Sequence, residues 1–303
     1  MKILLKCSML IFAERDRLEK IHQRGRDVCT LVNNSIQRTE KQIALQKEAL
    51  SESERAAEYK RNGDLITANI YLIKRGDTEL KAVDYYDEDC KEITILLDPR
   101  LSPSQNAQRM YKLYTKQKNA KETLALLIEQ WENELKYLES VQDFLLRASS
   151  EEDLLQIRDE LYHSGYASRM KGYQPQKVSK QKPYEFVTAS GYRLLVGKNN
   201  TQNDYLTFKV ATKGDLWFHA KDMPGSHALL LCDGEEPSEL DYTQAASIAA
   251  YHSKGRDSDT VAVDYTRVKN IKKPQGAKAG FVIYKTNYTA YVKPMENIEK
   301  ASS

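Results

Sequence analysis

Apolar residues recur every three, four or seven positions between Ile11 and about residue 59. The segment contains no proline and one glycine, Gly25. The apolar positions are Ile11, Leu18, Ile21, Val28, Val32, Ile36, Ile43 and Leu50. A narrow apolar seam with charged flanks is typical of a coiled coil, so the spacing predicts one long helix.

A second helix of comparable length is predicted from Pro103 to about Arg147. Ser102 can cap it, proline suits the first helical position, and Gln105 can close a capping box. Its seam consists of Met110, Tyr114, Leu124, Ile128, Trp131, Leu135, Leu138 and Leu145. At about 1.5 Å per residue either helix reaches roughly 65 to 75 Å. Two such helices are expected to pair antiparallel.

Residues 60 to 101, between the two helices, change character. LITANIYLIKRGD is consistent with a short helix, and KAVDYY and EITILLD with two strands, which predicts a small β-containing tip on an arm spanning residues 11 to 147. Ser150 to Asp153 form another capping box and Gly165 suits a helix end. This predicts a short helix over 151 to 164, inside a helix-and-linker region of 148 to 183.

From Tyr184 onward the pattern alternates with period two. The segments are YEFVTA, YRLLVG, YLTFKVA, DLWFHA, HALLLC, VAVDYT, FVIYKT and YTAYVKP. Only residues 242 to 254 have a helical pattern there. The expected fold class is α+β: a long antiparallel coiled-coil arm with a small β-containing tip, followed by a compact α+β domain at 184 to 295. Residues 1 to 10 match no element, and 296 to 303 form a tail.

Amino-acid composition excludes fewer function classes than the pattern of hydrophobic positions does. The net charge is +3 over 303 residues, so a partner must be inferred from local segments. Cys7, Cys29, Cys90 and Cys232 lack metal-site spacing, which favours reduced thiols in a cytoplasm. The apolar start is a poor signal peptide because Lys6 interrupts it. No apolar run is long enough to cross a bilayer. A membrane partner is therefore not expected.

The densest candidate chemistry is DLWFHAKDMPGSH, residues 215 to 227. If 215 to 221 is a strand, Trp217, His219 and Lys221 share one face. A ring, an imidazole and a cation suit stacking on a base while the lysine meets phosphate. The alternative is a tryptophan packed under the following loop beside an incidental histidine.

Two chemical alternatives involve the same segment. His219 and His227 could bind a metal with Asp215 or Asp222, but the Pro-Gly turn between the histidines gives no regular ligand geometry and no cysteine is near. Ser226 and His227 could form a nucleophile and base, but this pair needs a third orienting group and an oxyanion site. We therefore expect neither a metal site nor a catalytic residue.

Two flanking loops carry further polar residues. GKNNTQND, residues 197 to 204, either fixes its own turn through its amides or offers donors and acceptors to a nucleotide. Residues 265 to 280 hold five cations and no acid, and residues 242 to 295 hold nine Lys or Arg against three acids, hence +6. That loop is predicted to bind phosphate, with a solvated lysine-rich loop as the alternative.

These stretches together resemble a known family. GKNNTQNDYLTFKVATKGDLWFHAKDMPGSH and VDYTRVKNIKKPQGAKAGFVIY are similar to the NFACT-R domain of the NFACT ribosome quality-control factors, the family of bacterial RqcH and eukaryotic NEMF, often labelled fibronectin-binding proteins. FAERDRLEKIHQR, GDLITANIYLIKRGD and LDPRLSPSQNAQRMYKLYTKQKNA resemble that family's middle coiled-coil domain. The resemblance covers nearly all of residues 11 to 295.

The resemblance implies a placement factor that makes no bond itself. Full-length members bind the large ribosomal subunit obstructed by peptidyl-tRNA and recruit alanyl-tRNA, so that alanine is added without mRNA. The coiled coil would reach a stalk-base protein and NFACT-R would contact ribosomal RNA, with no cofactor and no small-molecule substrate. Family members also carry an NFACT-N domain and a helix-hairpin-helix region before the coiled coil. This sequence is expected to lack both, and with them the Asp-Arg element used for tRNA binding.

The expected RNA-binding residues are Asn199, Asn200, Asn203, Asp204, Trp217, His219, Lys221, Asp222, Ser226, His227, Arg267, Lys269, Lys272, Lys273 and Lys278. Two other function classes stay open from the sequence. One is a metal- or histidine-dependent nuclease, and the other is a fibronectin-binding adhesin, which only the family label suggests.

Overall fold

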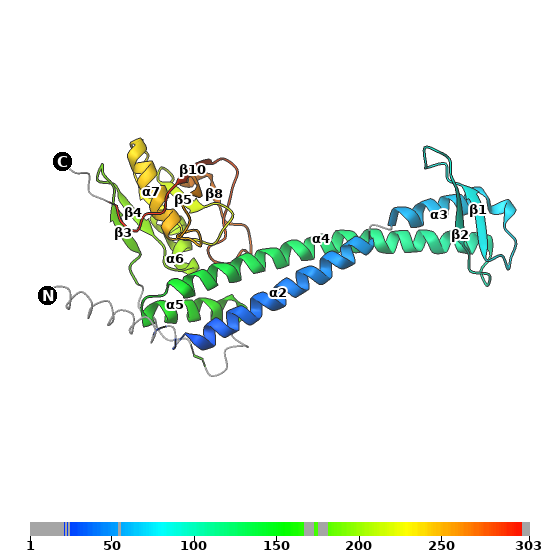
Figure 1. Ribbon diagram of the computed structural model, residues 1–303, viewed down its shortest axis with the longest axis horizontal. Coiled ribbons are helices and arrows are strands. Elements are labelled where there is room, and N and C mark those ends of the chain that lie inside the picture. The colour runs from blue at the N-terminus through cyan, green and yellow to red at the C-terminus, as the bar shows by residue number, and fades with distance from the viewer. Residues whose placement is uncertain are drawn as a thin grey trace. The chain divides into compact units, whose positions relative to one another are not determined.

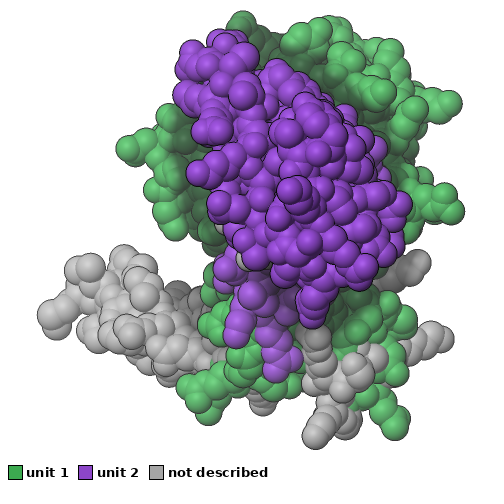
Figure 2. All heavy atoms as spheres, turned by 90° about the vertical axis from the view of Figure 1, so that its right-hand side faces the viewer, with its two compact units in different colours: residues 1–37, 135–303 green, residues 38–134 purple. Residues whose placement is uncertain are grey.

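The computed structural model describes residues 21, 23, 25–53, 56–166, 173–174 and 181–298. The chain divides into two compact units, which Figure 2 colours separately: unit 1 holds residues 1–37 and 135–303, and unit 2 holds residues 38–134. The predicted start at residues 1 to 10, and residues 167–172 and 175–180 of the predicted helix-and-linker region, lie outside the described residues.

The helices and strands follow in the order that Figure 1 labels. They are α2 (Arg26–Ser53), α3 (Ala56–Ala68), η1 (Ile70–Leu72), β1 (Glu79–Val83), β2 (Glu92–Leu96), α4 (Pro103–Arg147), α5 (Glu151–Leu161), η2 (Tyr162–Tyr166), β3 (Tyr184–Val187), β4 (Arg193–Val196), α6 (Asn200–Tyr205), η4 (Leu206–Val210), β5 (Leu216–Ala220), β6 (Ala228–Leu231), α7 (Glu239–Tyr251), β7 (Val261–Arg267), η5 (Val268–Asn270), β8 (Ile271–Lys272), β9 (Ile283–Tyr284) and β10 (Tyr288–Val292).

Helices α2 and α4 run antiparallel, as their spacing predicts. In unit 1 the Gln142 amide donates to Asn33 at 2.8 Å, and in unit 2 Lys47 pairs with Glu132 at 2.8 Å. Residue numbers rise along one helix as they fall along the other, which defines antiparallel pairing. The capping box at Ser102 is present, because its backbone N–H donates to Gln105 Oε1 at 2.8 Å and its hydroxyl accepts from the Gln105 N–H.

The tip in unit 2 is a hairpin of β1 and β2 with α3 beside it. Leu65, Ile66, Leu80 and Ile95 are buried in its core. The short helix predicted at LITANIYLIKRGD is only partly correct, because α3 ends at Ala68 and η1 follows. The helix predicted over 11 to 59 is described as α2 and the start of α3, and residues 54 and 55 between them lie outside the described residues. The two period-two segments are correctly predicted as strands.

The base of the arm in unit 1 is a three-helix cluster. Val32 of α2, Leu138 of α4 and Leu161 of α5 are fully buried in it, together with Val141 and Ile157. The predicted capping box at the start of α5 is present, since the Ser150 hydroxyl accepts from the Asp153 N–H and the Asp153 side chain accepts from the Ser150 N–H. The end of this helix also agrees with expectation, because Gly165 adopts a φ of 97°.

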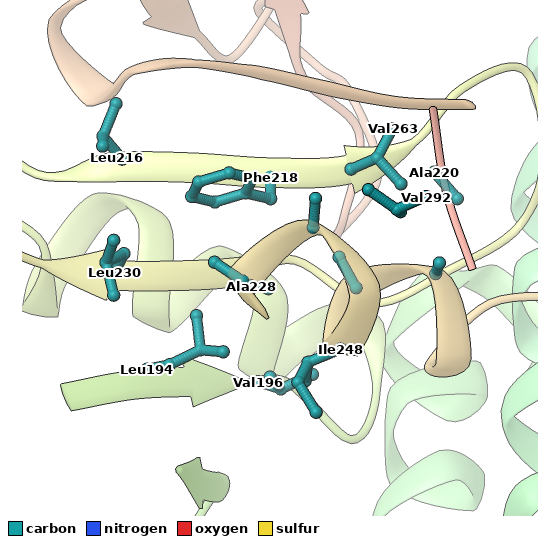
Figure 3. Packing of buried hydrophobic residues seen from close by; sticks show 14 of the residues in the cluster. Leu194, Val196, Leu216, Phe218, Ala220, Ala228, Leu230, Ile248, Val263 and Val292 are labelled. Carbon is teal, nitrogen blue, oxygen red and sulfur yellow. The ribbon is translucent and has the colours of Figure 1, made fainter. Parts of the chain in front are cut away.

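The second half of unit 1 is a six-stranded antiparallel sheet in the order β10-β7-β5-β6-β4-β3. Helix α7 covers one face, where Leu216, Phe218 and Ala220 of β5 enter the core that Figure 3 shows. Trp217 enters a second core on the other face, with Leu206 of η4 and Ile271 and Tyr284 of the β8–β9 pair. The two faces of β5 therefore separate as the alternation predicts, and the α+β fold class is confirmed.

One predicted strand, YLTFKVA at 205 to 211, is wrong. Residues 200–210 form α6 followed by a turn of π-helix, because Asn199 caps α6 by accepting from the Gln202 N–H at 2.8 Å. Leu206 and Val210, four positions apart, then face the core, and Phe208 between them is 36% exposed. The spacing of these apolar residues is compatible with both a strand and a helix, and the cap at Asn199 favours the helix.

Candidate nucleic-acid interface

Trp217, the proposed stacking residue, is 1% exposed. Its ring packs with Leu206 and Ile271, and the Tyr284 ring lies 5.1 Å away. His219 is partly exposed and stacks on Trp217 at 5.6 Å with an interplanar angle of 9°. The expectation that Trp217 lies on an exposed surface is therefore wrong. The residue is packed, as in the alternative, but mainly under η4 and the β8–β9 pair rather than under the loop that follows β5.

His227 and Ser226 are also interior residues rather than surface residues. His227 is 1% exposed, its Nδ1 lies 2.8 Å from the Thr207 hydroxyl, and its backbone N–H donates to Asn203 Oδ1. Burial, followed by the nearby His219, lowers the pKa of His227 well below its usual value. The Ser226 hydroxyl accepts from Arg147 Nη1 at 3.2 Å. The surface predicted at these positions is corrected to a hydrogen-bonded interior.

The asparagines of residues 197 to 204 fasten α6 to the base of the arm. The Asn199 amide donates to Gln156 of α5 at 2.7 Å. The Asn200 amide donates to Ser140 of α4 at 2.8 Å and to Glu160 of α5 at 3.0 Å. Asn199, Asn200 and Asn203 are at most 3% exposed. Their amides are therefore used within the chain, which corrects the expectation that they face a nucleotide.

Three of the five cations expected to bind phosphate have partners within the chain. Arg267 donates to Glu236 and to the Gly214 carbonyl, and its side chain is 20% exposed. Lys273 pairs with Asp204, whose other oxygen accepts from the Gly280 N–H at 2.9 Å. Lys278 lies over the rings of Tyr137 and Tyr166, at 4.4 and 5.0 Å from their centroids. The first function of these three cations is to hold the loop in place.

The remaining two cations, Lys269 and Lys272, are exposed. The segments 204–215 and 267–280 lie side by side, because the Lys269 N–H donates to the Lys213 carbonyl at 3.3 Å and the Asp204 carboxylate accepts from Gly280 at the other end. Exposed side chains on these two segments form what we term the basic aromatic surface: Tyr205, Phe208, Lys209, Lys213, Lys269 and Lys272. Its four lysines form no ion pair with any described residue.

The sequence interpretation missed Tyr205, Phe208, Lys209 and Lys213. A strand at 205 to 211 places Phe208 on the same side as Leu206, toward the core. The signal that could have found them is the helix cap at Asn199, which places residues 205 and 208–209 on the outer side of a helix. Lys221 and Asp222 are exposed at the other end of β5, so both stay candidates for RNA contact.

The described residues contain no group of three or more His, Cys, Asp or Glu side chains placed to hold a metal ion. None of the described helices is both long enough and apolar enough to cross a membrane.

The loop that carries Lys278 depends on Gly280. This residue has a φ of +79°, and a Cβ there would lie 2.3 Å from Asn200 Oδ1. Gly276 has a similar φ of +75° with open space around it. We expect Gly276→Ala to cost about 1 kcal/mol from backbone strain alone, and Gly280→Ala to cost at least about 1 kcal/mol more because it also displaces Asn200. Denaturant unfolding followed by Trp217 fluorescence, with Trp131 replaced by Phe, measures both; equal costs would contradict the role of the Asn200 contact.

Three histidines with lowered pKa values make stability depend on pH. Burial, and then Arg147, Arg256 and Lys198, lower the pKa of His252 to about 3, and burial lowers the pKa values of His219 and His227. The unfolded chain takes up protons below about pH 6.5 while the folded chain does not, so stability is lost as pH falls. We expect His252 alone to contribute a loss of about 2 kcal/mol between pH 7 and pH 5. His252→Gln should remove that part of the slope and His163→Gln, at an exposed position, should not; identical slopes for both variants would refute the assignment.

Comparisons with known proteins agree with the resemblance seen in the sequence. Residues 8–181 match the model of the NFACT N-terminal and middle domains, and residues 182–300 match the model of the NFACT protein RNA binding domain. The chain is 41% identical over 287 residues to the Rqc2 homolog RqcH of Bacillus subtilis (strain 168), covering 93% of this chain and 49% of that protein. It is also 41% identical over 287 residues to the Rqc2 homolog RqcH of Streptococcus suis (strain 05ZYH33), covering 94% and 50%.

The chain thus spans about half the length of the curated relatives it matches. A solved structure, the C-terminal part of the fibronectin/fibrinogen-binding protein from Streptococcus suis, matches with a TM-score of 0.70 and 36% identity. That match covers 91% of this chain and 96% of the other. By sequence and by fold, this chain belongs to the NFACT family.

Proposed function

We propose that this chain is the ribosome-contacting part of a ribosome quality-control factor, and that it binds ribosomal RNA of the large subunit. The observation that carries the proposal is the basic aromatic surface, which lies within the residues that match the RNA-binding domain model. The relatives named Rqc2 homolog RqcH support the role in ribosome quality control.

The proposed binding is electrostatic with a contribution from stacking. Lys209, Lys213, Lys269 and Lys272 would neutralise backbone phosphates and release counterions, which makes the affinity depend on salt. Tyr205 is 50% exposed and Phe208 is 36% exposed, so both rings can accept an unpaired base. These two rings take the part that the sequence interpretation gave to Trp217.

The contribution of this chain to the whole factor would be placement. Asn200 ties the sheet domain to α4 and α5 through buried hydrogen bonds, so RNA bound by this domain is fixed relative to the base of the arm. In full-length relatives the same placement would accompany recruitment of alanyl-tRNA to an obstructed subunit, in the cytoplasm and without a membrane, cofactor or small-molecule substrate. The peptidyl-transferase centre would make the bond.

The tip in unit 2 is the proposed contact for a stalk-base protein. It exposes large apolar side chains, among them Tyr71 at 77% and Leu96 at 75%, and an exposed apolar patch is typical of an interaction site. Leu72 and Val83, at 56% and 54%, add to the apolar area. A protein surface, rather than RNA, suits such side chains because aromatic and aliphatic anchors carry most of the energy of protein interfaces.

The two alternative function classes are a nuclease and a fibronectin-binding adhesin. A nuclease using His219, His227 and Asp222 would need His227 to reach a phosphodiester, whereas its imidazole is buried against Thr207. Fibronectin binding is named in the description of the matching Streptococcus suis structure. Immobilised fibronectin and an RNA cleavage assay test these two classes directly.

The lysines of the basic aromatic surface should control affinity for the large subunit. We expect Lys269→Gln with Lys272→Gln to weaken co-sedimentation with purified large subunits several-fold, and to reduce the slope of log affinity against log salt by about 2. The control is Lys112→Gln with Lys116→Gln, which removes the same amount of charge from α4, outside the basic aromatic surface. If that control loses as much affinity as the test variant, or if the test variant binds like the wild type, the proposed surface is wrong.

The tip should contribute to binding of the subunit without contributing to binding of free RNA. We expect Tyr71→Ser with Leu96→Ser to lower co-sedimentation with large subunits at least tenfold while affinity for isolated ribosomal RNA is unchanged. Leu126→Ser is the control, because Leu126 is 62% exposed but lies on α4 outside the tip. An unchanged affinity of the tip variant for the subunit would contradict the proposed protein contact.

A further inference from the structure

A second cationic cluster lies where the end of α4 meets the sheet domain, within unit 1. Arg147, the last residue of α4, has a side chain only 10% exposed. Its Nη2 pairs with Asp143 at 2.5 Å and its Nη1 donates to the Ser226 hydroxyl at 3.2 Å. Its Nε has no hydrogen-bond partner among the described residues. The buried guanidinium is thus only partly satisfied by the chain.

His252, at the end of α7, adjoins Arg147 through Ser226. The Ser226 N–H donates to the His252 carbonyl at 2.8 Å, while its hydroxyl accepts from Arg147. The His252 ring is 8% exposed and stacks on Tyr184 at 4.7 Å. Its Nε2 lacks a hydrogen-bond partner within the part of the chain that the structure describes. A buried polar atom without a partner is costly and points to a group that completes it.

Three more cations surround these two residues. Lys198 Nζ lies 4.5 Å from the centroid of the Tyr184 ring on which His252 stacks. The Lys254 N–H donates to the Pro224 carbonyl at 2.9 Å, which brings the loop after α7 beside the loop before Ser226. The Arg256 guanidinium lies 5.9 Å from the centroid of the Tyr251 ring. Lys254 and Arg256 follow His252 within four residues of the chain, and Lys198 reaches it through the Tyr184 ring.

Among the described residues one carboxylate, Asp143, forms an ion pair with a cation of the cluster, and its partner is Arg147. Lys198, Lys254 and Arg256 form no ion pair there, although the carboxyls of Asp153, Asp257 and Glu296 lie near enough to raise the pKa of Tyr184 or Tyr251. Burial raises the pKa of Asp143 while Arg147, Arg256 and Lys254 oppose the rise, so Lys254 and Arg256 are close enough to influence the same carboxyl.

We infer that Lys198, Lys254 and Arg256, around His252 and Arg147, form a binding site for a phosphate group of the RNA backbone. Unpaired cations around unsatisfied buried nitrogens are the chemistry that recognises a phosphate oxygen. Of these, Arg256 offers two parallel donors, while the lysines act as point charges. The inference rests on the proposed RNA-binding function and adds a second point of contact to it.

The second site is distinct from the basic aromatic surface. Lys213 precedes β5 and Lys269 bonds to it, whereas the Lys254 backbone bonds to Pro224 beyond the other end of the strand. Residues 215 and 221 are six steps apart, or about 20 Å at roughly 3.3 Å per residue. An RNA strand held at both ends of β5 would be fixed in direction across the sheet domain.

The test compares two double variants of the full chain. Lys254→Gln with Arg256→Gln removes the second site, and Lys269→Gln with Lys272→Gln removes part of the basic aromatic surface. Binding to purified large subunits is measured over a salt series, with Lys112→Gln and Lys116→Gln as the charge-matched control. We expect the second-site variant to lose about fivefold or more in affinity and about 2 in salt slope. If the double variant has a lowered unfolding midpoint, Lys254→Gln alone replaces it, with an expected loss of about 1 in slope.

A direct readout comes from the His252 ring. Ribosomal RNA is titrated into 15N-histidine-labelled protein, and the imidazole nitrogen signals of His252 should shift because a bound phosphate offsets the surrounding cations. The inference is overturned when the second-site variant binds like the wild type and the His252 signals stay fixed at saturating RNA, while the Lys269 and Lys272 variant still loses affinity. If neither double variant loses affinity, the proposed function itself fails.

Discussion

The structure depends on one buried polar contact, in which Asn200 at the start of α6 meets Glu160 of α5. Glu160 is 5% exposed, and burial raises the pKa of its carboxyl although the Asn200 amide and the Thr201 N–H both donate to it. Removing one partner of such a contact costs more than the hydrogen bond itself, because the other group is left buried and unsatisfied. The contact therefore specifies a single orientation of the sheet domain on the helices of unit 1.

The same requirement explains why the polar residues of the sheet domain are concentrated in one stretch of sequence. Asn203 accepts from the His227 backbone, His227 meets Thr207, and Asp204 accepts from Gly280. Each polar side chain satisfies a backbone or side-chain group that packing against Trp217 would otherwise bury without a partner. Residues that look like a ligand site in the sequence thus form a support, and the exposed Tyr205 and Lys269 beside them are groups that we propose contact RNA.

Features encoded locally could be predicted from the sequence, and features decided by tertiary contacts could not. The capping boxes at Ser102 and Ser150 depend on four neighbouring residues each, and both are present. The alternation in β5 correctly predicted which side chains lie on each face of the sheet. It cannot predict whether other elements pack on the second face. Trp217 is buried because η4 and the β8–β9 pair pack on it, and the strand wrongly predicted at 205 to 211 left that layer out.

The positions of unpaired charges also depend on tertiary contacts and could not be predicted from composition. Composition gives residues 242 to 295 a charge of +6, yet it cannot distinguish Lys273, which pairs with Asp204, from Lys272, which faces solvent. Cations with internal partners order the loops, and the cations left over project from the backbone of those loops. Because their charge is gathered on one part of the surface, a chain of small net charge can still attract a polyanion. Binding then requires only that unpaired cations gather where the backbone is rigid, as they do at the two ends of β5.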